Sequence, residues 1–221
     1  MKHRISSICI LLLSALLLGL TACAPLSGGS ASPAEGTLEV HFLDVGQGDA
    51  ALLLCGGEAM LIDGGNVEDS SLVAAYLKAH EVTYLDYIVC THAHEDHVGG
   101  LSGALNAAAA GIVLSPVQEY DSKAFRDFVK YTKTQGKALT IPSPGDRFPL
   151  GSAQVEVLAP LRDYEETNNT SLVLKVTHGA VSFLFTGDAE RLSEGDMLEA
   201  GLDVSATVLK VGHHGSDSST S

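Results

Sequence analysis

Three histidines and two acids stand close together in residues 91–97, which read Thr-His-Ala-His-Glu-Asp-His. Imidazole nitrogens and carboxylate oxygens are the ligands that proteins offer to Zn²⁺ and Mn²⁺. So many polar side chains in so short a segment would make a poor hydrophobic core. The segment therefore predicts a divalent metal site. A solvated histidine-rich loop is the alternative.

The elements on either side must position this cluster. Residues 86–90 have the apolar pattern of a buried strand, and Gly99-Gly100 opens into a helix expected over 98–110. Further helices are expected over 68–79, 122–134 and 189–199. Strands are expected over 38–45, 50–55, 59–63, 112–114, 155–158, 172–177, 181–186 and 206–211. This order predicts an α/β domain in which two sheets pack face to face under helices.

Three other motifs follow the same order as the motifs of a known family. They are Leu61-Ile62-Asp63-Gly64-Gly65, Phe185-Thr186-Gly187-Asp188, and Lys210-Val211-Gly212-His213-His214-Gly215-Ser216. Together with His92-x-His94-x-Asp96-His97 they resemble the metallo-β-lactamase superfamily, which implies a four-layer αββα sandwich over residues 37–221. Residues 42–50 (FLDVGQGDA) and the 211–216 motif also resemble the hydrolase domain of the ComEC family of DNA-uptake proteins.

The resemblance implies a ligand set. His92 and His94 match the ligands of a first metal, Asp96 and His97 match those of a second, and Asp188 matches a bridging carboxylate. Either His213 or His214 could complete the second site. We favour His213, which directly follows Val211-Gly212, and leave His214 to contact the substrate or donate a proton. Two Zn²⁺ ions are expected, with Mn²⁺ as the alternative, and Asp96 is also expected to orient the attacking water.

The chain departs from the family where another first-site histidine is usual, because residues 167–171 read Thr-Asn-Asn-Thr-Ser. This weakens the first site. Asn168 and Asn169 either contact a phosphate or form a structural turn. His41, His80 and His178 are interpreted as ordinary surface or packed histidines.

Three acids have roles that the pattern leaves open. Asp63 either orients a ligand imidazole through a hydrogen bond or belongs to an Asp-Gly turn. Asp44 and Asp49 flank Gly46-Gln47-Gly48, and they either line the substrate entrance or stabilise the loop.

The two ends of the chain carry their own signals. Residues 1–22 hold Lys2, Arg4 and an apolar run that spans only ~20 Å as a helix, which is typical of a signal peptide and short for a membrane span. Leu20-Thr21-Ala22-Cys23 resembles a bacterial lipobox, so Cys23 is expected to carry lipid and residues 23–36 to form a flexible tether. The expected location is the extracytoplasmic face of the membrane. The last motif is followed closely by Ser221, so a truncated C-terminal part is also expected.

Composition limits the partners and the redox state. The 221 residues are 45% hydrophobic and carry a formal net charge of −14, which suits one domain and opposes polyanion binding by bulk electrostatics. Cys55 and Cys90 lie in apolar runs, which favours buried thiols, although a disulfide between them stays open. The oligomeric state is not assigned.

The function implied by the ComEC resemblance is that of a phosphodiesterase or nuclease. A bound divalent ion lowers the pKa of a coordinated water to about 7, which supplies hydroxide at neutral pH. Two alternatives remain: a non-catalytic metal-binding accessory lipoprotein, and a hydrolase that acts on another ester or a lactam.

Overall fold

The computed structural model describes residues 36–220. The predicted signal peptide, Cys23 and all but the last residue of the predicted tether lie outside those residues. Within them, no helix has the length and apolarity that a membrane span requires.

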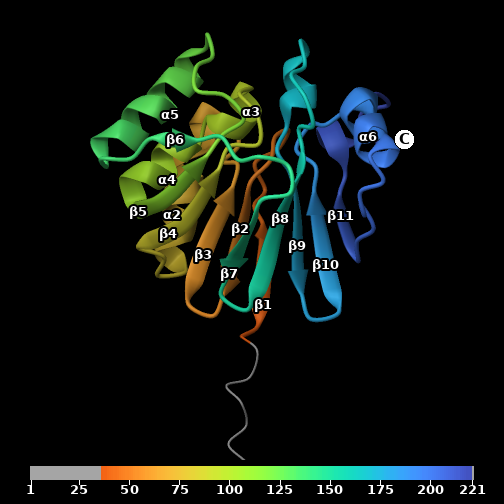
Figure 1. Cartoon of the computed structure of the whole chain (residues 1–221). Helices are drawn as coiled ribbons and strands as arrows, with labels where there is room; N and C mark the ends of the chain where they lie inside the picture. Colours follow the sequence, from red (N-terminus) through yellow and green to blue (C-terminus); the bar gives the residue numbers. More distant parts are fainter. Residues whose placement is uncertain (1–35, 221) are drawn as a thin grey trace, which may run out of the picture. The chain divides into compact units, whose positions relative to one another are not determined.

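The first sheet has six strands in the order of the chain, which Figure 1 shows beneath helices α2, α4 and α5. Its first three strands pair antiparallel and the later ones pair parallel. The strands are β1 (Leu38–Phe42), β2 (Ala51–Cys55), β3 (Glu58–Ile62), β4 (Tyr84–Val89), β5 (Ala109–Leu114) and β6 (Leu139–Thr140).

The second sheet has the order β11-β10-β9-β8-β7 and is antiparallel except for the parallel pair β10 and β11. Its strands are β7 (Arg147–Leu150), β8 (Ala153–Ala159), β9 (Val173–His178), β10 (Val181–Phe185) and β11 (Val208–Lys210). Pro149 is tolerated in β7 because this strand lies at the edge of the sheet, where a missing backbone donor is least costly.

The two sheets pack face to face over a core that includes Leu53 and Met60 from one sheet and Val155 and Leu174 from the other. The outer face of the first sheet is covered by helices α2 (Ser70–Ala79), α4 (Leu101–Ala107) and α5 (Lys123–Thr134). Helix α6 (Arg191–Glu199) covers the second sheet. The predicted αββα sandwich is therefore confirmed, and Figure 1 shows its layers.

The expected helix over 98–110 is wrong in its bounds. Helix α3 (Glu95–Val98) ends before Gly99, and α4 ends at Ala107. Ala109 and Ala110 already belong to β5, where they pair with β4. The high helix propensity of alanine is overridden here by sheet pairing. Strands β6 and β7 were not expected from the sequence, and three short 3₁₀ helices complete the fold: η1 (Val67–Asp69), η2 (Thr167–Thr170) and η3 (Gly212–Gly215).

Two further histidines, His41 and His178, and both described cysteines make contacts within the fold. Among the described residues, Cys55 and Cys90 are buried free thiols, as predicted. His41 Nδ1 lies 3.0 Å from the Tyr76 hydroxyl, and His178 Nε2 lies 3.0 Å from Ser152 Oγ.

Candidate metal centre

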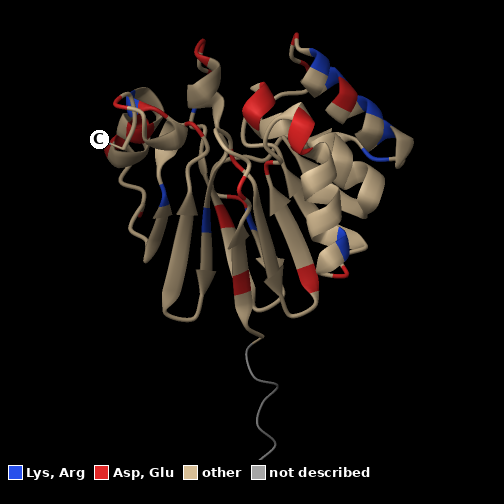
Figure 2. Ribbon diagram, turned by 180° about the vertical axis from the view of Figure 1, so that it is seen from behind, with Lys and Arg blue, Asp and Glu red and all other residues tan. Residues whose placement is uncertain are grey.

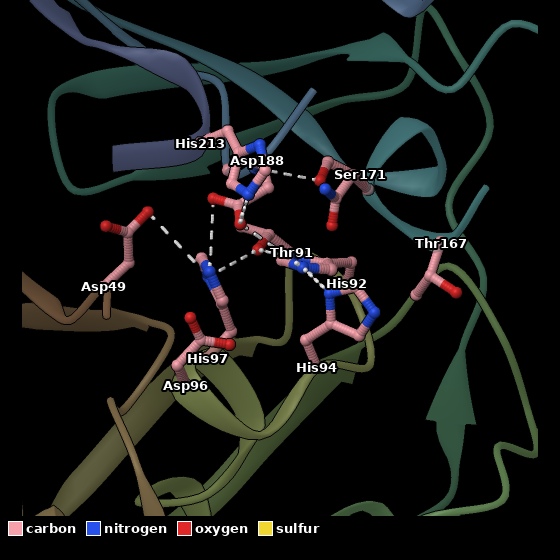
Figure 3. A network of polar contacts seen from close by, with 12 residues as sticks. Asp49, Thr91, His92, His94, Asp96, His97, Thr167, Ser171, Asp188 and His213 are labelled. Atoms are coloured by element: carbon pink, nitrogen blue, oxygen red, sulfur yellow. Dashed lines mark hydrogen bonds and ion pairs between the residues drawn. The ribbon is translucent and has the colours of Figure 1, made fainter. Parts of the chain in front are cut away.

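The polar motifs meet at one edge of the two sheets. Asp63 follows β3, residues 91–97 follow β4, and Asp188 follows β10. His213 and His214 follow β11, which runs parallel to β10. Asp49 precedes β2, which is antiparallel to β3 and therefore starts where β3 ends. Strand direction thus brings five separate segments together, as Figure 3 shows for most of their side chains.

Four of these side chains form a compact group of potential ligands. Asp49, His97, Asp188 and His214 each offer one ligand atom, and these atoms all lie within 4.8 Å of one another. Asp188 is central to the group: its Oδ1 lies 3.2 Å from His97 Nε2, and its Oδ2 lies 3.3 Å from His214 Nε2. Asp96 Oδ2 is also 3.3 Å from His214 Nε2.

The group fits a divalent cation. His97 Nε2, Asp188 Oδ1 and His214 Nε2 are buried atoms that make no hydrogen bond within the described part of the chain. Buried polar atoms are normally satisfied, so three from different segments aimed at one point call for a ligand. Three carboxylates, those of Asp49, Asp96 and Asp188, surround two imidazoles, and a cation would offset their mutual repulsion.

Asp63 orients the His97 ring through the ring nitrogen that does not face Asp188. Its fully buried carboxylate accepts hydrogen bonds from the Thr91 backbone N–H at 2.8 Å and the Thr91 hydroxyl at 2.6 Å. The same carboxylate lies 2.8 Å from His97 Nδ1, which leaves Nε2 to face Asp188. Burial lowers the pKa of His97, but the carboxylates of Asp63 and Asp188 outweigh it and raise that pKa to about 10. This arrangement matches the orienting role expected for Asp63.

Backbone contact between glycines holds the loops after β3 and β4 together. The Gly64 N–H donates to the His97 carbonyl at 2.8 Å. A Cβ on Gly100 would lie 1.9 Å from the Gly64 carbonyl oxygen. Only glycine permits this approach, which keeps Asp63 beside His97.

The two neighbouring histidines after β11 have different partners. His214 Nδ1 lies 3.5 Å from Asp49 Oδ1, and its Nε2 faces Asp96 and Asp188. These three carboxylates, with Asp188 foremost, raise the pKa of His214 to about 11. His213 Nδ1 instead lies 2.9 Å from Glu190, and its Nε2 is 3.9 Å from Asp188.

The geometry therefore differs from the expectation that favoured His213 as the ligand. Both residues have positive φ, 43° for His213 and 53° for His214. Two successive left-handed residues bend the chain sharply, which turns the adjacent rings toward different partners. The motif alone does not reveal this bend.

His92 and His94 adjoin the group. His92 Nε2 lies 3.1 Å from His94 Nδ1 and 3.8 Å from Asp188 Oδ2. Burial holds the pKa of His92 well below its ordinary value, so the ring is neutral, which is the form that binds metals. Figure 3 shows both rings on the side of the site that faces Thr167.

The other residues that the sequence singled out make hydrogen bonds within the fold. Asp44 is exposed and its carboxylate accepts from the Gly46 N–H at 3.3 Å. Asn169 is buried, and its side-chain oxygen accepts from the N–H groups of Glu190 and Ser193 at the start of α6. Asn168 donates to Glu190 at 3.2 Å. A loop contact thus accounts for Asp44, whereas Asn168 and Asn169 join residues 167–171 to the start of α6.

Sequence reasoning missed the position of Lys210. Its ammonium group contacts the Asp49 carboxylate and lies 3.2 Å from the Gly187 carbonyl oxygen. It also undervalued Asp49, which is one of the four potential ligands. Both residues lie within quoted motifs, but only the packing of the two sheets against each other places them together.

The superfamily assignment follows from the whole-domain match. The pattern of the metallo-beta-lactamase superfamily matches residues 43–221. The chain belongs to this superfamily. Among solved structures, the metallo-beta-lactamase SMB-1 has a similar fold, with a TM-score of 0.55 at 20% identity over 79% of this chain and 76% of that one.

Two curated relatives of this metallo-beta-lactamase superfamily member extend the comparison. ComE operon protein 3 of Bacillus subtilis is 29% identical over 201 residues, which cover 82% of the chain and 26% of that relative. Zinc phosphodiesterase ELAC protein 1 of Homo sapiens is 32% identical over 105 residues, which cover 42% of the chain and 28% of that relative. The chain spans about a quarter of the length of these two relatives. The resemblance to ComEC-like proteins is confirmed.

Proposed function

We propose that this protein is a metal-dependent phosphodiesterase of the ComEC-like branch, with nucleic acid as its substrate class. One observation carries the proposal: the ligand atoms of Asp49, His97, Asp188 and His214 converge within 4.8 Å in a superfamily fold. The names of the relatives add support, because one is called a zinc phosphodiesterase and another is called competence protein ComA.

Asp49, His97, Asp188 and His214, with Asp96 beside them, would hold the principal ion, which we propose to be Zn²⁺, with Mn²⁺ as the alternative. Such an ion would supply a nucleophilic water near neutral pH and would polarise a phosphoryl oxygen on the phosphorus under attack. His92 and His94, with Asp188 shared between them and the principal ligands, would hold a second and weaker ion. Its weakness follows from the missing histidine at residues 167–171.

The remaining side chains orient groups and move protons. The His214 imidazole, 3.3 Å from the carboxylate of Asp96, lowers the pKa of that carboxyl to about 2, so Asp96 stays charged and can orient the attacking water. His213 takes the role first expected for His214. Glu190 holds its Nδ1, and the ring is 32% exposed, so Nε2 can donate a proton to the leaving oxygen.

The test is hydrolysis of bis(p-nitrophenyl) phosphate by the purified protein with Zn²⁺ or Mn²⁺. Asp188→Asn and Asp96→Asn should each lower kcat/KM at least about 100-fold, because each removes charge from the ligand group. Asp44→Asn is the matched control, since Asp44 is exposed and outside that group. Absence of turnover with either metal, or full activity of Asp96→Asn, would refute the proposal.

A non-catalytic metal-binding accessory role is the second candidate. It is favoured by residues 167–171, which cap α6 through Asn169 and supply no histidine to the site. Tight metal binding without hydrolysis of any substrate would support this role. Activity assays with carboxyl esters and a β-lactam distinguish these two candidates, the phosphodiesterase and the accessory protein, from a hydrolase that acts on another substrate.

We also propose that the protein is exported and anchored through lipid on Cys23, after removal of residues 1–22 and with residues 23–36 as a tether. The lipobox-like sequence before Cys23 supports this. Wild-type protein expressed in a bacterial host should fractionate with membranes and bear a lipid-modified N-terminus by mass spectrometry. Cys23→Ala should abolish the modification, and an unmodified wild-type N-terminus would contradict the proposal.

A further inference from the structure

The chain carries a stripe of positive charge that the site does not use. Five of its 13 Lys and Arg residues fall within residues 123–137, at Lys123, Arg126, Lys130, Lys133 and Lys137. Their spacing of three, four, three and four residues places them along one face of a helix. The first four lie on α5 and the fifth follows it, and Figure 2 shows the blue bands gathered on this helix.

All five side chains are exposed, because the opposite face of α5 buries Phe125 and Phe128 in the core. Two of the five have acidic partners: Lys123 pairs with Asp127, and Arg126 pairs with Asp121. Lys130, Lys133 and Lys137 have no acid within ion-pair distance among the described residues. In a chain of net charge −14, this leaves a local surface that attracts anions.

The stripe is connected to the metal centre through an aromatic residue. The Tyr120 ring lies 6.2 Å from the His94 ring on one side and 6.2 Å from the Phe125 ring of α5 on the other, measured between ring centroids. Helix α3, which carries Asp96 and His97, packs against α5. A molecule lying along α5 would therefore reach the metal centre past Tyr120.

A surface hollow of about 580 Å³ lies between Tyr120 and the stripe. Arg126 and Lys133 line it, together with Glu119 and Asp121, and Asp121 is already paired with Arg126. A half-buried aromatic ring beside cations is the combination that binds single-stranded nucleic acids. The bases stack on the ring, and the phosphates lie along the cations.

We infer that α5, with Tyr120, is the surface that binds single-stranded nucleic acid and leads it into the metal centre. The inference rests on the proposed phosphodiesterase function. Lys130, Lys133 and Lys137 would contact successive phosphates, and Tyr120 would stack on a base next to the bond that is cleaved. The local stripe overcomes the acidic average of the chain because phosphates and lysines interact within about one Debye length.

The test uses the full chain and a fluorescein-labelled single-stranded DNA 20-mer, with EDTA present to prevent cleavage. Fluorescence polarisation measures Kd across salt concentrations. Lys130→Gln/Lys133→Gln should raise Kd roughly ten- to a hundredfold at low salt and reduce the slope of log K against log salt by about 0.7 per lost contact. Lys78→Gln/Arg147→Gln is the control, because it removes the same charge from two other exposed sites.

Tyr120 is tested separately. Tyr120→Leu should weaken binding about five- to a hundredfold, whereas Tyr120→Phe should keep it, because stacking needs the ring and not the hydroxyl.

Equal weakening by the α5 pair and the control pair would overturn the inference, since it would show a general charge effect. Loss of binding to phosphatidylglycerol vesicles with unchanged DNA binding would also overturn it and assign the stripe to a membrane surface. If no variant or wild type cleaves the small diester, the proposed function fails, while the DNA-binding measurements still decide the role of α5.

Discussion

Asp63 is the residue on which the orientation of His97 depends. It is fully buried at a φ of 57°, and its carboxylate meets Thr91 and the His97 ring. An aspartate that served only an Asp-Gly turn would need none of these contacts, so they favour the interpretation in which Asp63 orients the His97 ring. Asparagine tolerates the same left-handed backbone, which makes Asp63→Asn an informative change.

Asp63→Asn should lower Zn²⁺ affinity about 10- to 100-fold, because the amide no longer holds the His97 ring through a charged hydrogen bond. Competition with a chromophoric chelator measures the affinity. Asp44→Asn should leave it unchanged. Unaltered Zn²⁺ affinity in Asp63→Asn would show that His97 does not depend on this carboxylate.

Asn169 illustrates how a residue beside a site can serve the fold. Its buried oxygen accepts two backbone N–H groups at the start of α6. Asn169→Ala leaves both donors without that partner, so the free energy of unfolding should fall by about 1–3 kcal/mol in urea denaturation. Asn168→Ala, which removes one hydrogen bond to Glu190, should cost less than about 1 kcal/mol. A reversed order of the two losses would contradict this assignment.

At the scale of elements, the packing of the β3 loop against α4 depends on Gly100. Gly100→Ala would place a Cβ 1.9 Å from the Gly64 carbonyl oxygen, so the two segments must separate. We expect a loss of about 3 kcal/mol in unfolding free energy, as for overpacking in a rigid site. Reduced metal affinity should accompany it, because Asp63 directly precedes Gly64 and His97 lies in α3, three residues before Gly100.

Gly195 supplies the matched control. It lies in α6, and a Cβ there would meet nothing within 4 Å. Gly195→Ala should stabilise the protein by about 0.5–1 kcal/mol, because alanine favours helix. If Gly100→Ala were as well tolerated, the contact between the two loops would not determine the site.

At the scale of the whole molecule, the metal centre joins the two sheets. Asp49, Asp63 and His97 come from the first sheet, whereas Asp188 and His214 follow strands of the second. An ion bound between them adds a link across the sandwich and offsets the repulsion among carboxylates. Metal binding should therefore stabilise the fold as a unit.

Saturating Zn²⁺ at about 100 times its Kd should add about 2.7 kcal/mol to stability, which corresponds to a Tm increase of about 5–10 °C. Differential scanning calorimetry with Zn²⁺ and with EDTA measures the shift. Asp188→Asn should abolish it and Asp44→Asn should keep it. An equal shift in wild type and Asp188→Asn would place the ion elsewhere.

Much of this organisation could be predicted from local sequence. The apolar periods of residues 51–62 and 173–185 and the order of the polar motifs determined the sheets and the superfamily, because strand alternation and motif spacing are local properties. The histidines and acids of residues 91–97 likewise indicated a metal.

Only the tertiary structure decided which atoms face one another. The packing of the two sheets brought Asp49 beside Lys210 and into the group of potential ligands, and two left-handed residues turned His214 inward and His213 toward Glu190. Sheet pairing also moved Ala109 and Ala110 from the expected helix into β5. These outcomes depend on contacts between segments distant along the chain and on backbone angles, and neither is encoded in the spacing of residues within a motif.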